Sequence, residues 1–458
     1  MRRNLELARL GGKGSGRYAL YKARQTFASA EQKIELAEQF QLKTATDVTE
    51  SLGNMKGALM KIGQMASYLD TGLPEHVRQT LASLQHDAPP MAPELVADQI
   101  VSELGRRPED LFLEWDPEPI ASASIGQVHR AITHAGEAVA VKVQYPGVAE
   151  AMESDLRNAD WVFRSMAVMF PGVEPEPVVA ELRERLVEEL DYTAEAANQR
   201  HFHSYFEKHP YIHVPAVLEE YSTAKILTSE LATGSRFSEV LTWSDEEQNL
   251  AAETLFRFSF GAIYRLHSFN GDPHPGNYLF NPGGQVTFLD FGLVKRFNRD
   301  QTKFFEELII EMVVRRDHAA FRRAVERAGI LPVGADISDE LVNEYFSYYY
   351  LYVMDDKPLT IDEDYAAGGV KHIFDTGGPY KELRQLLNVP PSFVVLQRIT
   401  LGLMGLFAQL EATRNWHKIA RELWPFTMDP PSTPIGERIA EWEAQYNKRA
   451  LWAATNDD

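Results

Sequence analysis

The sequence predicts an α+β fold, in which a helical N-terminal part precedes a small strand-bearing region and a mainly helical remainder. The apolar residues at positions 52, 55, 59, 62, 66 and 69 have the spacing of one face of an amphipathic helix. Short β-branched runs appear between residues 120 and 144, and a single strand–turn–strand pattern follows residue 245. The chain has 458 residues, which is long enough for two or three lobes.

Prolines and glycines indicate where these parts begin and end. Gly72 and Pro74 end the first helical pattern, and three prolines interrupt residues 105–119, which we therefore interpret as a boundary. We expect four segments, in chain order a basic flexible arm (1–27), a helical extension (28–115), a strand-bearing lobe (116–231) and a helical lobe (232–458).

Individual elements follow from local patterns of apolar residues and turn residues. We expect strands at Gln127–Ala131, Ala138–Gln144, Val214–Leu218 and Lys225–Ser229, and a hairpin over Tyr278–Leu289 that turns at Pro282–Gly284. We expect helices at about residues 176–204, where the sequence is acidic, and at Ser392–Leu410, which is apolar but contains Gln397 and Arg398. A buried helix suits that last segment better than a membrane span, because charges are costly in the bilayer.

Composition excludes several classes of function. The chain has no cysteine, which removes disulfides, thiolate metal sites and cysteine nucleophiles. Its net charge of −20 argues against nucleic acid as a partner, because binding to phosphates needs a basic surface.

Charge is unevenly distributed along the chain. Residues 1–24 carry seven basic side chains and one acidic one, a net charge of +6, without an apolar run typical of a secretory signal. This arm could contact anionic lipid headgroups, although a solvated flexible terminus explains it too. The last residues, ALWAATNDD, do not resemble a membrane helix. We therefore expect a cytoplasmic protein whose membrane contact, if it has one, is peripheral at the inner face.

Three short segments carry the strongest chemical signal. Lys142 ends the β-branched run Val139–Lys142, Asp272 and Asn277 begin and end the segment DPHPGN, and Asp290 begins the segment DFG. The spacing of Asp272 and Asn277 matches the D-x-x-x-x-N pattern of a protein-kinase catalytic loop. Each segment alone is common in proteins, but the three in this order predict a protein-kinase-like bilobal fold.

Phosphoryl transfer accounts for each of these residue types. A lysine on a strand can hold the α- and β-phosphates of ATP, and Mg²⁺ prefers hard oxygen ligands such as those of Asn277 and Asp290. Asp272 would accept a proton from the attacking group or orient that group. We therefore expect ATP or ADP and Mg²⁺ as cofactors.

The chain resembles the UbiB/ADCK-type atypical kinases. The resemblance rests on KIGQ at residues 61–64, on the alanine-rich ASASIGQVH at 121–129, on VAVKVQYPGV at 139–148, on ELDY at 189–192 with EAAN at 195–198, and on the DPHPGN and DFG segments. It implies a protein-kinase-like fold that uses a nucleotide with Mg²⁺, and a role linked to isoprenoid lipid or quinone metabolism. A lipid or a quinone precursor is accordingly an expected small-molecule partner.

The resemblance also suggests roles for further residues. Ala121, Ser122, Ala123 and Ser124 stand where ordinary kinases have a glycine-rich loop over the nucleotide, and Glu230 and Leu231 stand at the adenine-binding hinge. Side chains in the alanine-rich loop restrict the backbone that glycine would leave free.

Two lysines need acidic partners. We assign Glu195 to Lys142 as the ion pair of the family, and Glu189 with Asp191 to Lys61. On one ideal helix Glu189 and Asp191 point in different directions, so the helix must bend or end near them. Lys61, Gly63 and Gln64 belong to a segment that covers the active-site cleft in the family.

The chain departs from ordinary kinases in ways that bear on the substrate. His274 replaces the lysine two residues after the catalytic aspartate, Asn270 replaces the usual histidine two residues before it, and no Ala-Pro-Glu follows Asp290. The loss of the histidine leaves open how the catalytic loop is braced, and the missing Ala-Pro-Glu segment favours a non-peptide substrate. Three hypotheses follow: an atypical kinase or ATPase, a nucleotide-gated scaffold without phosphoryl transfer, and a protein kinase.

Overall fold

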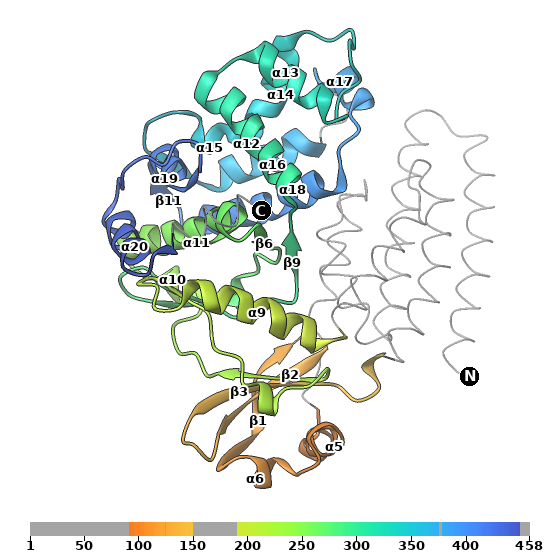
Figure 1. Ribbon diagram of the computed structural model, residues 1–458, viewed down its shortest axis with the longest axis vertical. Coiled ribbons are helices and arrows are strands. Elements are labelled where there is room, and N and C mark those ends of the chain that lie inside the picture. The colour runs from red at the N-terminus through yellow and green to blue at the C-terminus, as the bar shows by residue number, and fades with distance from the viewer. Residues whose placement is uncertain (1–90, 124, 150–189, 375–377, 449–458) are drawn as a thin grey trace, which may run out of the picture. The chain divides into compact units, whose positions relative to one another are not determined.

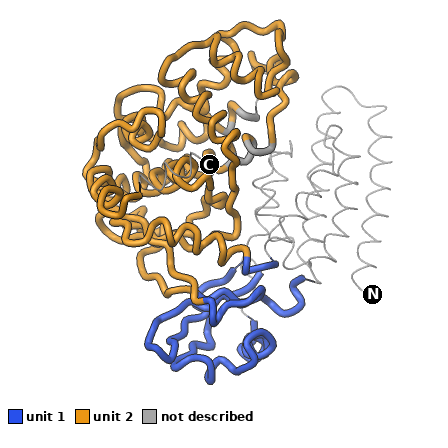
Figure 2. Tube along the Cα trace, in the orientation of Figure 1, with its two compact units in different colours: residues 1–193, 219–228 blue, residues 194–218, 229–458 orange. Residues whose placement is uncertain are grey.

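The computed structural model describes residues 91–123, 125–149, 190–374 and 378–448 (Figure 1). The chain divides into two compact units, the first formed by residues 1–193 with 219–228 and the second by residues 194–218 with 229–458 (Figure 2). The four segments expected from the sequence stay a prediction, since most of the first two lie outside the described residues.

The first unit is built on a four-stranded sheet with the strand order β1-β2-β3-β5. Its strands are β1 (Glu114–Ala123), β2 (Gly126–Ile132), β3 (Ala138–Gln144) and β5 (Ile226–Glu230), accompanied by the helices α5 (Pro93–Leu104) and α6 (Pro108–Leu111). The sequence predicts β2, β3 and β5 to within one or two residues. β1, which contains two prolines and was expected to be a boundary, is a strand.

Alternation of side chains explains why β3 forms. Val139, Val141 and Val143 are fully buried on one face of the strand, whereas Ala140 and Lys142 are only half-buried. β2 pairs with β3 in antiparallel register, with Val128 opposite Lys142. This register fixes the position of Lys142 on the sheet.

The second unit surrounds the long helix α11 (Asp245–Arg265), which packs against α19 (Trp416–Leu423) and against strands β6 (Ser268–Asn270), β8 (Gln285–Phe288) and β11 (Ala412–Arg414). Its other helices are α9 (Tyr192–Phe206), α10 (Phe237–Val240), α12 (Arg299–Ile309), α13 (His318–Arg327), α14 (Asp339–Ser347), α15 (Leu351–Met354), α16 (Glu363–Phe374), α17 (Lys381–Leu386), α18 (Pro391–Gln409), α19 (Trp416–Leu423) and α20 (Pro434–Gln445). Its strands are β4 (Ile212–His213), β6 (Ser268–Asn270), β7 (Tyr278–Asn281), β8 (Gln285–Phe288), β9 (Val294–Arg296), β10 (Leu359–Ile361) and β11 (Ala412–Arg414).

Several predictions for this unit are confirmed and two are wrong. The hairpin β7–β8 and the helix α18 lie where the sequence predicts them. Val214–Leu218 is not a strand, because β4 covers only Ile212–His213 and Val217 forms an isolated bridge to Ser229. The acidic helix does not run unbroken through residues 176–204, because α9 begins at Tyr192, after a turn at Leu190.

The core of this unit is rich in aromatic residues. Phe258 of α11 stacks on Phe288 of β8 with 3.6 Å between ring centroids, and Phe202 of α9 packs against Phe258 at 5.5 Å. A buried ion network also crosses this core, since Arg257 of α11 pairs with Glu253 at 2.9 Å and with Glu422 of α19 at 2.7 Å. The two helices are therefore held together by charge as well as by apolar packing.

Candidate active site

The DPHPGN segment links β6 to β7 and contains the short 3-10 turn η3 (Pro275–Asn277). The Nδ2 group of Asn277 donates a hydrogen bond to the backbone carbonyl of Asp272 at 3.1 Å, and His274 Nδ1 accepts one from the Gly276 amide at 3.1 Å. The segment is thus a closed turn that brings its first and last residues together. With its Nδ2 group engaged in the turn, Asn277 offers its side-chain oxygen to a cation.

The DFG segment follows β8 directly. Leu289 N donates to the carbonyl of Asn277 at 2.9 Å, which ties the strand leading into Asp290 to the end of the DPHPGN turn. Asp290 Oδ1 accepts a hydrogen bond from Gly292 N at 2.9 Å, and Phe291 is fully buried against Phe202, with 5.1 Å between ring centroids. The buried ring anchors the segment while Asp290 stays half-exposed.

Asn270 connects these two segments. Its Nδ2 group donates to the backbone carbonyl of Asp290 at 2.8 Å, and its Oδ1 accepts from the backbone amide of Asp272 at 3.3 Å. One carboxamide therefore bridges the two aspartates that the sequence predicts to be functional. A carboxamide provides one donor group and one acceptor atom, as this bridge requires, and it does so without titrating. The sequence shows Asn270 only as a departure from the usual histidine, and its bracing role was missed.

Helix α9 contacts the DFG segment through two side chains. Glu195 is buried, and its Oε2 lies 3.7 Å from the position that a Cβ on Gly292 would occupy. Asn198 Nδ2 donates to the carbonyl of Phe291 at 3.1 Å, and Asn198 Oδ1 accepts from Arg296 Nη2 at 3.1 Å. In the sequence, Asn198 is marked only by its place in the EAAN segment, and that resemblance assigns Asn198 no role of its own.

The predicted phosphate-binding residues lie in the first unit. Lys142 projects from β3, and its Nζ is 4.8 Å from the centre of the Tyr192 ring. Ala121, Ser122 and Ala123 lie at the end of β1 and pair with β2, whereas Ser124 lies outside the described residues. The pairing of Lys142 with Glu195, which belongs to the second unit, stays a prediction.

The alanine-rich segment is held close to the sheet by one glycine. A Cβ on Gly126, the first residue of β2, would lie 2.2 Å from the carbonyl oxygen of Val143 on β3. Only glycine permits this approach of two backbones. The start of β2 at Gly126 is therefore packed directly on the strand that carries Lys142.

The remaining predicted residues are placed as follows. Glu230 ends β5, and Leu231 follows it. The Glu230 amide donates to the carbonyl of Ala216 at 2.8 Å, and the Glu230 carboxylate lies 3.3 Å from His213 Nε2. Asp191 precedes α9, and its Oδ1 accepts hydrogen bonds from the amide and the hydroxyl of Thr193 at 2.9 and 2.6 Å. Lys61, Gly63, Gln64 and Glu189 lie outside the described residues, so the partners of Lys61 stay a prediction.

The donors at the DPHPGN and DFG segments suit a hard cation. Asn277 and Asp290 offer an amide and a carboxylate, both oxygen ligands, and Mg²⁺ typically takes one or two protein ligands and completes its shell with phosphate and water. Among the residues that the structure describes, no group of three or more histidine, aspartate or glutamate side chains could hold a metal ion without such help. The residues therefore fit Mg²⁺ bound together with a nucleotide, and do not form an all-protein metal cage.

Comparison with known proteins finds one matching family model and several similar proteins. A family model described as the ABC1 atypical kinase-like domain matches residues 83–325, more than half of the chain. The mitochondrial atypical kinase COQ8 of Saccharomyces cerevisiae is 30% identical over 281 residues, which are 61% of this chain and 56% of that protein. A probable protein kinase UbiB from Pseudomonas aeruginosa is 28% identical over 394 residues, 82% of this chain and 69% of that protein.

Two further comparisons concern coverage and fold. An uncharacterized chloroplastic aarF domain-containing protein kinase of Arabidopsis thaliana is 29% identical over 413 residues, and the match covers 86% of this chain but only 56% of that protein. The solved structure of Rv3197 from Mycobacterium tuberculosis in complex with erythromycin is 28% identical, with a TM-score of 0.61, and the match covers 87% of this chain and 100% of that chain. These matches confirm the protein-kinase-like α+β fold. Within the described ranges no helix has the length and apolar character needed to cross a membrane.

Proposed function

This chain belongs to the ABC1 atypical kinase-like family, and from that premise we propose that it is a Mg²⁺-dependent, ATP-binding kinase or ATPase of the UbiB type. The observation that carries the proposal is the bridge of Asn270 between Asp272 and Asp290, with Asn277 hydrogen-bonded to Asp272 in the same turn. Asp272, Asn277 and Asp290, to which we assign the proton-accepting and Mg²⁺-binding roles, are thereby held in one small region.

Each residue then has a stated task. Asp272 accepts a proton from the attacking hydroxyl or water, or orients that group. Lys142 would hold the α- and β-phosphates, and we assign Glu195 to it as the ion-pair partner that the resemblance to the family implies. Asn277 and Asp290 would hold Mg²⁺, which would neutralise charge on the phosphate oxygens.

We further propose that the activity supports isoprenoid lipid or quinone metabolism. The support is the resemblance of the KxGQ, alanine-rich, DPHPGN and DFG segments to the UbiB type, together with the matches to the COQ8 and UbiB proteins. A peptide substrate is disfavoured because no Ala-Pro-Glu segment follows Asp290.

The test measures ADP release from ATP with and without Mg²⁺, and with phenolic or isoprenoid compounds added. We expect Mg²⁺-dependent release in the unaltered chain, and a loss of at least 100-fold in Asp290→Asn and Asp272→Asn. Asp300→Asn, at an exposed position in the first turn of α12, is the matched control and should leave the rate unchanged.

The result separates the three hypotheses. Stabilisation by ATP without turnover under any of these conditions would favour a nucleotide-gated scaffold, and phosphate transfer to peptides at an ordinary rate would favour a protein kinase. Full activity in Asp290→Asn would refute the assignment.

A further inference from the structure

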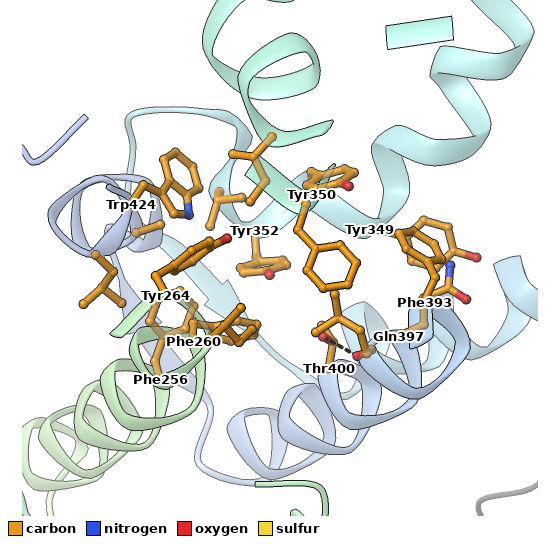
Figure 3. A pocket seen from close by; sticks show the side chains of 17 residues that line it. Phe256, Phe260, Tyr264, Tyr349, Tyr350, Tyr352, Phe393, Gln397, Thr400 and Trp424 are labelled. Atoms are coloured by element: carbon orange, nitrogen blue, oxygen red, sulfur yellow. Dashed lines mark hydrogen bonds between the residues drawn. The ribbon is translucent and has the colours of Figure 1, made fainter. Parts of the chain in front are cut away.

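The second unit contains a cavity that the phosphoryl-transfer residues do not use. It lies among α11, α18, α19 and the segment that includes η5 (Tyr348–Tyr350) and α15 (Figure 3). Its volume is about 80 Å³, it is partly open to solvent, and every residue that lines it belongs to this unit. None of the residues that we assign to nucleotide or metal lines it.

The walls of this cavity are mostly aromatic and apolar. Phe256 and Phe260 of α11 and Trp424 after α19 form one part of the wall, and Phe393 of α18 belongs to another. Figure 3 shows Trp424 and Phe393 on opposite sides, with Tyr352 between them. Aromatic rings therefore line the cavity from both sides, and its surface favours an apolar occupant.

Polar groups in the same cavity constrain that occupant. The hydroxyls of Tyr350 and Tyr352 and the side-chain amide of Gln397 make no hydrogen bond to any part of the chain that the structure describes. Both tyrosines are partly buried against the core, and burial raises the pKa of each hydroxyl above its usual range. The hydroxyls are therefore protonated at neutral pH and can donate. By contrast, the Thr400 hydroxyl is used within α18, where it donates to the Leu396 carbonyl at 2.9 Å.

These features exclude the simplest occupants. A pure hydrocarbon would cover the tyrosine hydroxyls and leave them without partners, which costs their desolvation free energy. Water beside the tyrosine hydroxyls would find partners there, but water along the rest of the wall would lack the two to four polar partners that it needs, because that part is aromatic. The volume is about half of the roughly 150 Å³ of an engineered cavity that binds benzene, so a slender chain end fits better than a fused ring system.

We propose that this cavity binds the oxygen-bearing end of a slender apolar molecule, an alcohol or carbonyl compound with an isoprenoid or an acyl chain. The oxygen accepts hydrogen bonds from Tyr350 or Tyr352, the chain lies along the aromatic wall, and a longer chain leaves through the open side. This site is separate from the residues of the proposed function, and binding there requires neither a nucleotide nor phosphoryl transfer, so the two proposals can fail independently.

The test is calorimetric titration of the full chain without nucleotide. The ligands are geraniol for the isoprenoid source, 1-decanol for the acyl source, and 2,6-dimethyloctane as a hydrocarbon without oxygen. We expect at least one alcohol to bind about tenfold more tightly than the hydrocarbon, and the alcohol that binds better identifies the source.

Variants then locate the binding. Tyr352→Phe keeps the ring but removes the hydroxyl, so it should weaken the binding of the alcohol by about fivefold and leave the affinity for the hydrocarbon unchanged. Thr400→Met places a longer side chain in the cavity, so it should lower the affinity for both ligands at least tenfold. Tyr446→Phe, at an exposed tyrosine that does not line the cavity, should alter neither. Absence of binding to the unaltered chain, or equal affinities in Thr400→Met and the unaltered chain, would overturn the proposal.

Discussion

Replacement of Asn270 by alanine tests whether one side chain braces the candidate active site. The substitution removes a 2.8 Å hydrogen bond to the carbonyl of Asp290 and a 3.3 Å hydrogen bond from the amide of Asp272. Asn270 is only 9% exposed, so water cannot easily replace both bonds. An unsatisfied buried polar group costs about 1–3 kcal/mol, and the longer bond contributes at the low end. We therefore expect a loss of about 2–4 kcal/mol in the stability of this region.

The assay combines urea unfolding with the rate of ADP release. Asn270→Ala should lower the urea midpoint and reduce ADP release by at least tenfold, because Asp272 and Asp290 lose their shared support. Asn270→Asp keeps an acceptor for the amide of Asp272 but sets an oxygen against the carbonyl of Asp290, so it should not restore the rate. Asn281→Ala is the control, since its bond to the Thr233 carbonyl is 3.4 Å long and exposed. An Asn270→Ala variant with the unfolding midpoint and rate of the unaltered chain would refute the reasoning.

Three further predictions concern stability. Burial is the main cause that lowers the pKa of His209 to about 3, and two backbone amides donate to its Nδ1. Because His209 takes up a proton near pH 6.5 in the unfolded chain but not in the folded chain, the free energy of unfolding should fall by about 2 kcal/mol between pH 7.5 and pH 5. His209→Gln should reduce this pH dependence in urea unfolding. Gly402→Val should lower the thermal midpoint, since a Cβ there would lie 2.4 Å from Pro273 Cγ, whereas Gly405→Val, where nothing lies within 4 Å, should cost less. Arg257→Met should lower the free energy of unfolding by about 3–5 kcal/mol, because it leaves the buried carboxylate of Glu422 without its counter-charge. A variant as stable as the unaltered chain would show that the ion network is dispensable.

The sequence predicts the elements that depend on local pattern. The β-branched run of valines predicts β3, and the turn residues Pro282–Gly284 predict the β7–β8 hairpin. The order of Lys142 and the DPHPGN and DFG segments likewise reveals the kinase-like fold without structural data.

The elements that were missed depend on tertiary context. β1 contains prolines at 117 and 119, but it is an edge strand with two register shifts, where a missing backbone donor is tolerated. β10 and β11 have three residues each and pair across more than 50 positions in the chain, so no local signal identifies them. β6 and β9 are equally short, and their pairing is what places Asn270 beside the DFG segment.

The roles of individual site residues show the same limit. Motif spacing identifies Asp272 and Asp290, but it does not show that a carboxamide from β6 joins them. Asn198 lies eight positions beyond Leu190, and only the start of α9 at Tyr192 fixes which of its neighbours faces the DFG segment. Such contacts depend on where a helix begins, and sequence patterns place helix ends poorly.

Titration with ATP in the presence and absence of Mg²⁺ tests the proposed function most directly, namely that the binding of Mg²⁺ and ATP requires both Lys142 and Asp290. We predict that Mg²⁺ raises the affinity of the unaltered chain for ATP and that Asp290→Ala abolishes this effect of Mg²⁺. Lys142→Ala should lower the affinity for ATP at least tenfold whether or not Mg²⁺ is present. Affinities that do not depend on Mg²⁺, or that neither substitution changes, would contradict the account.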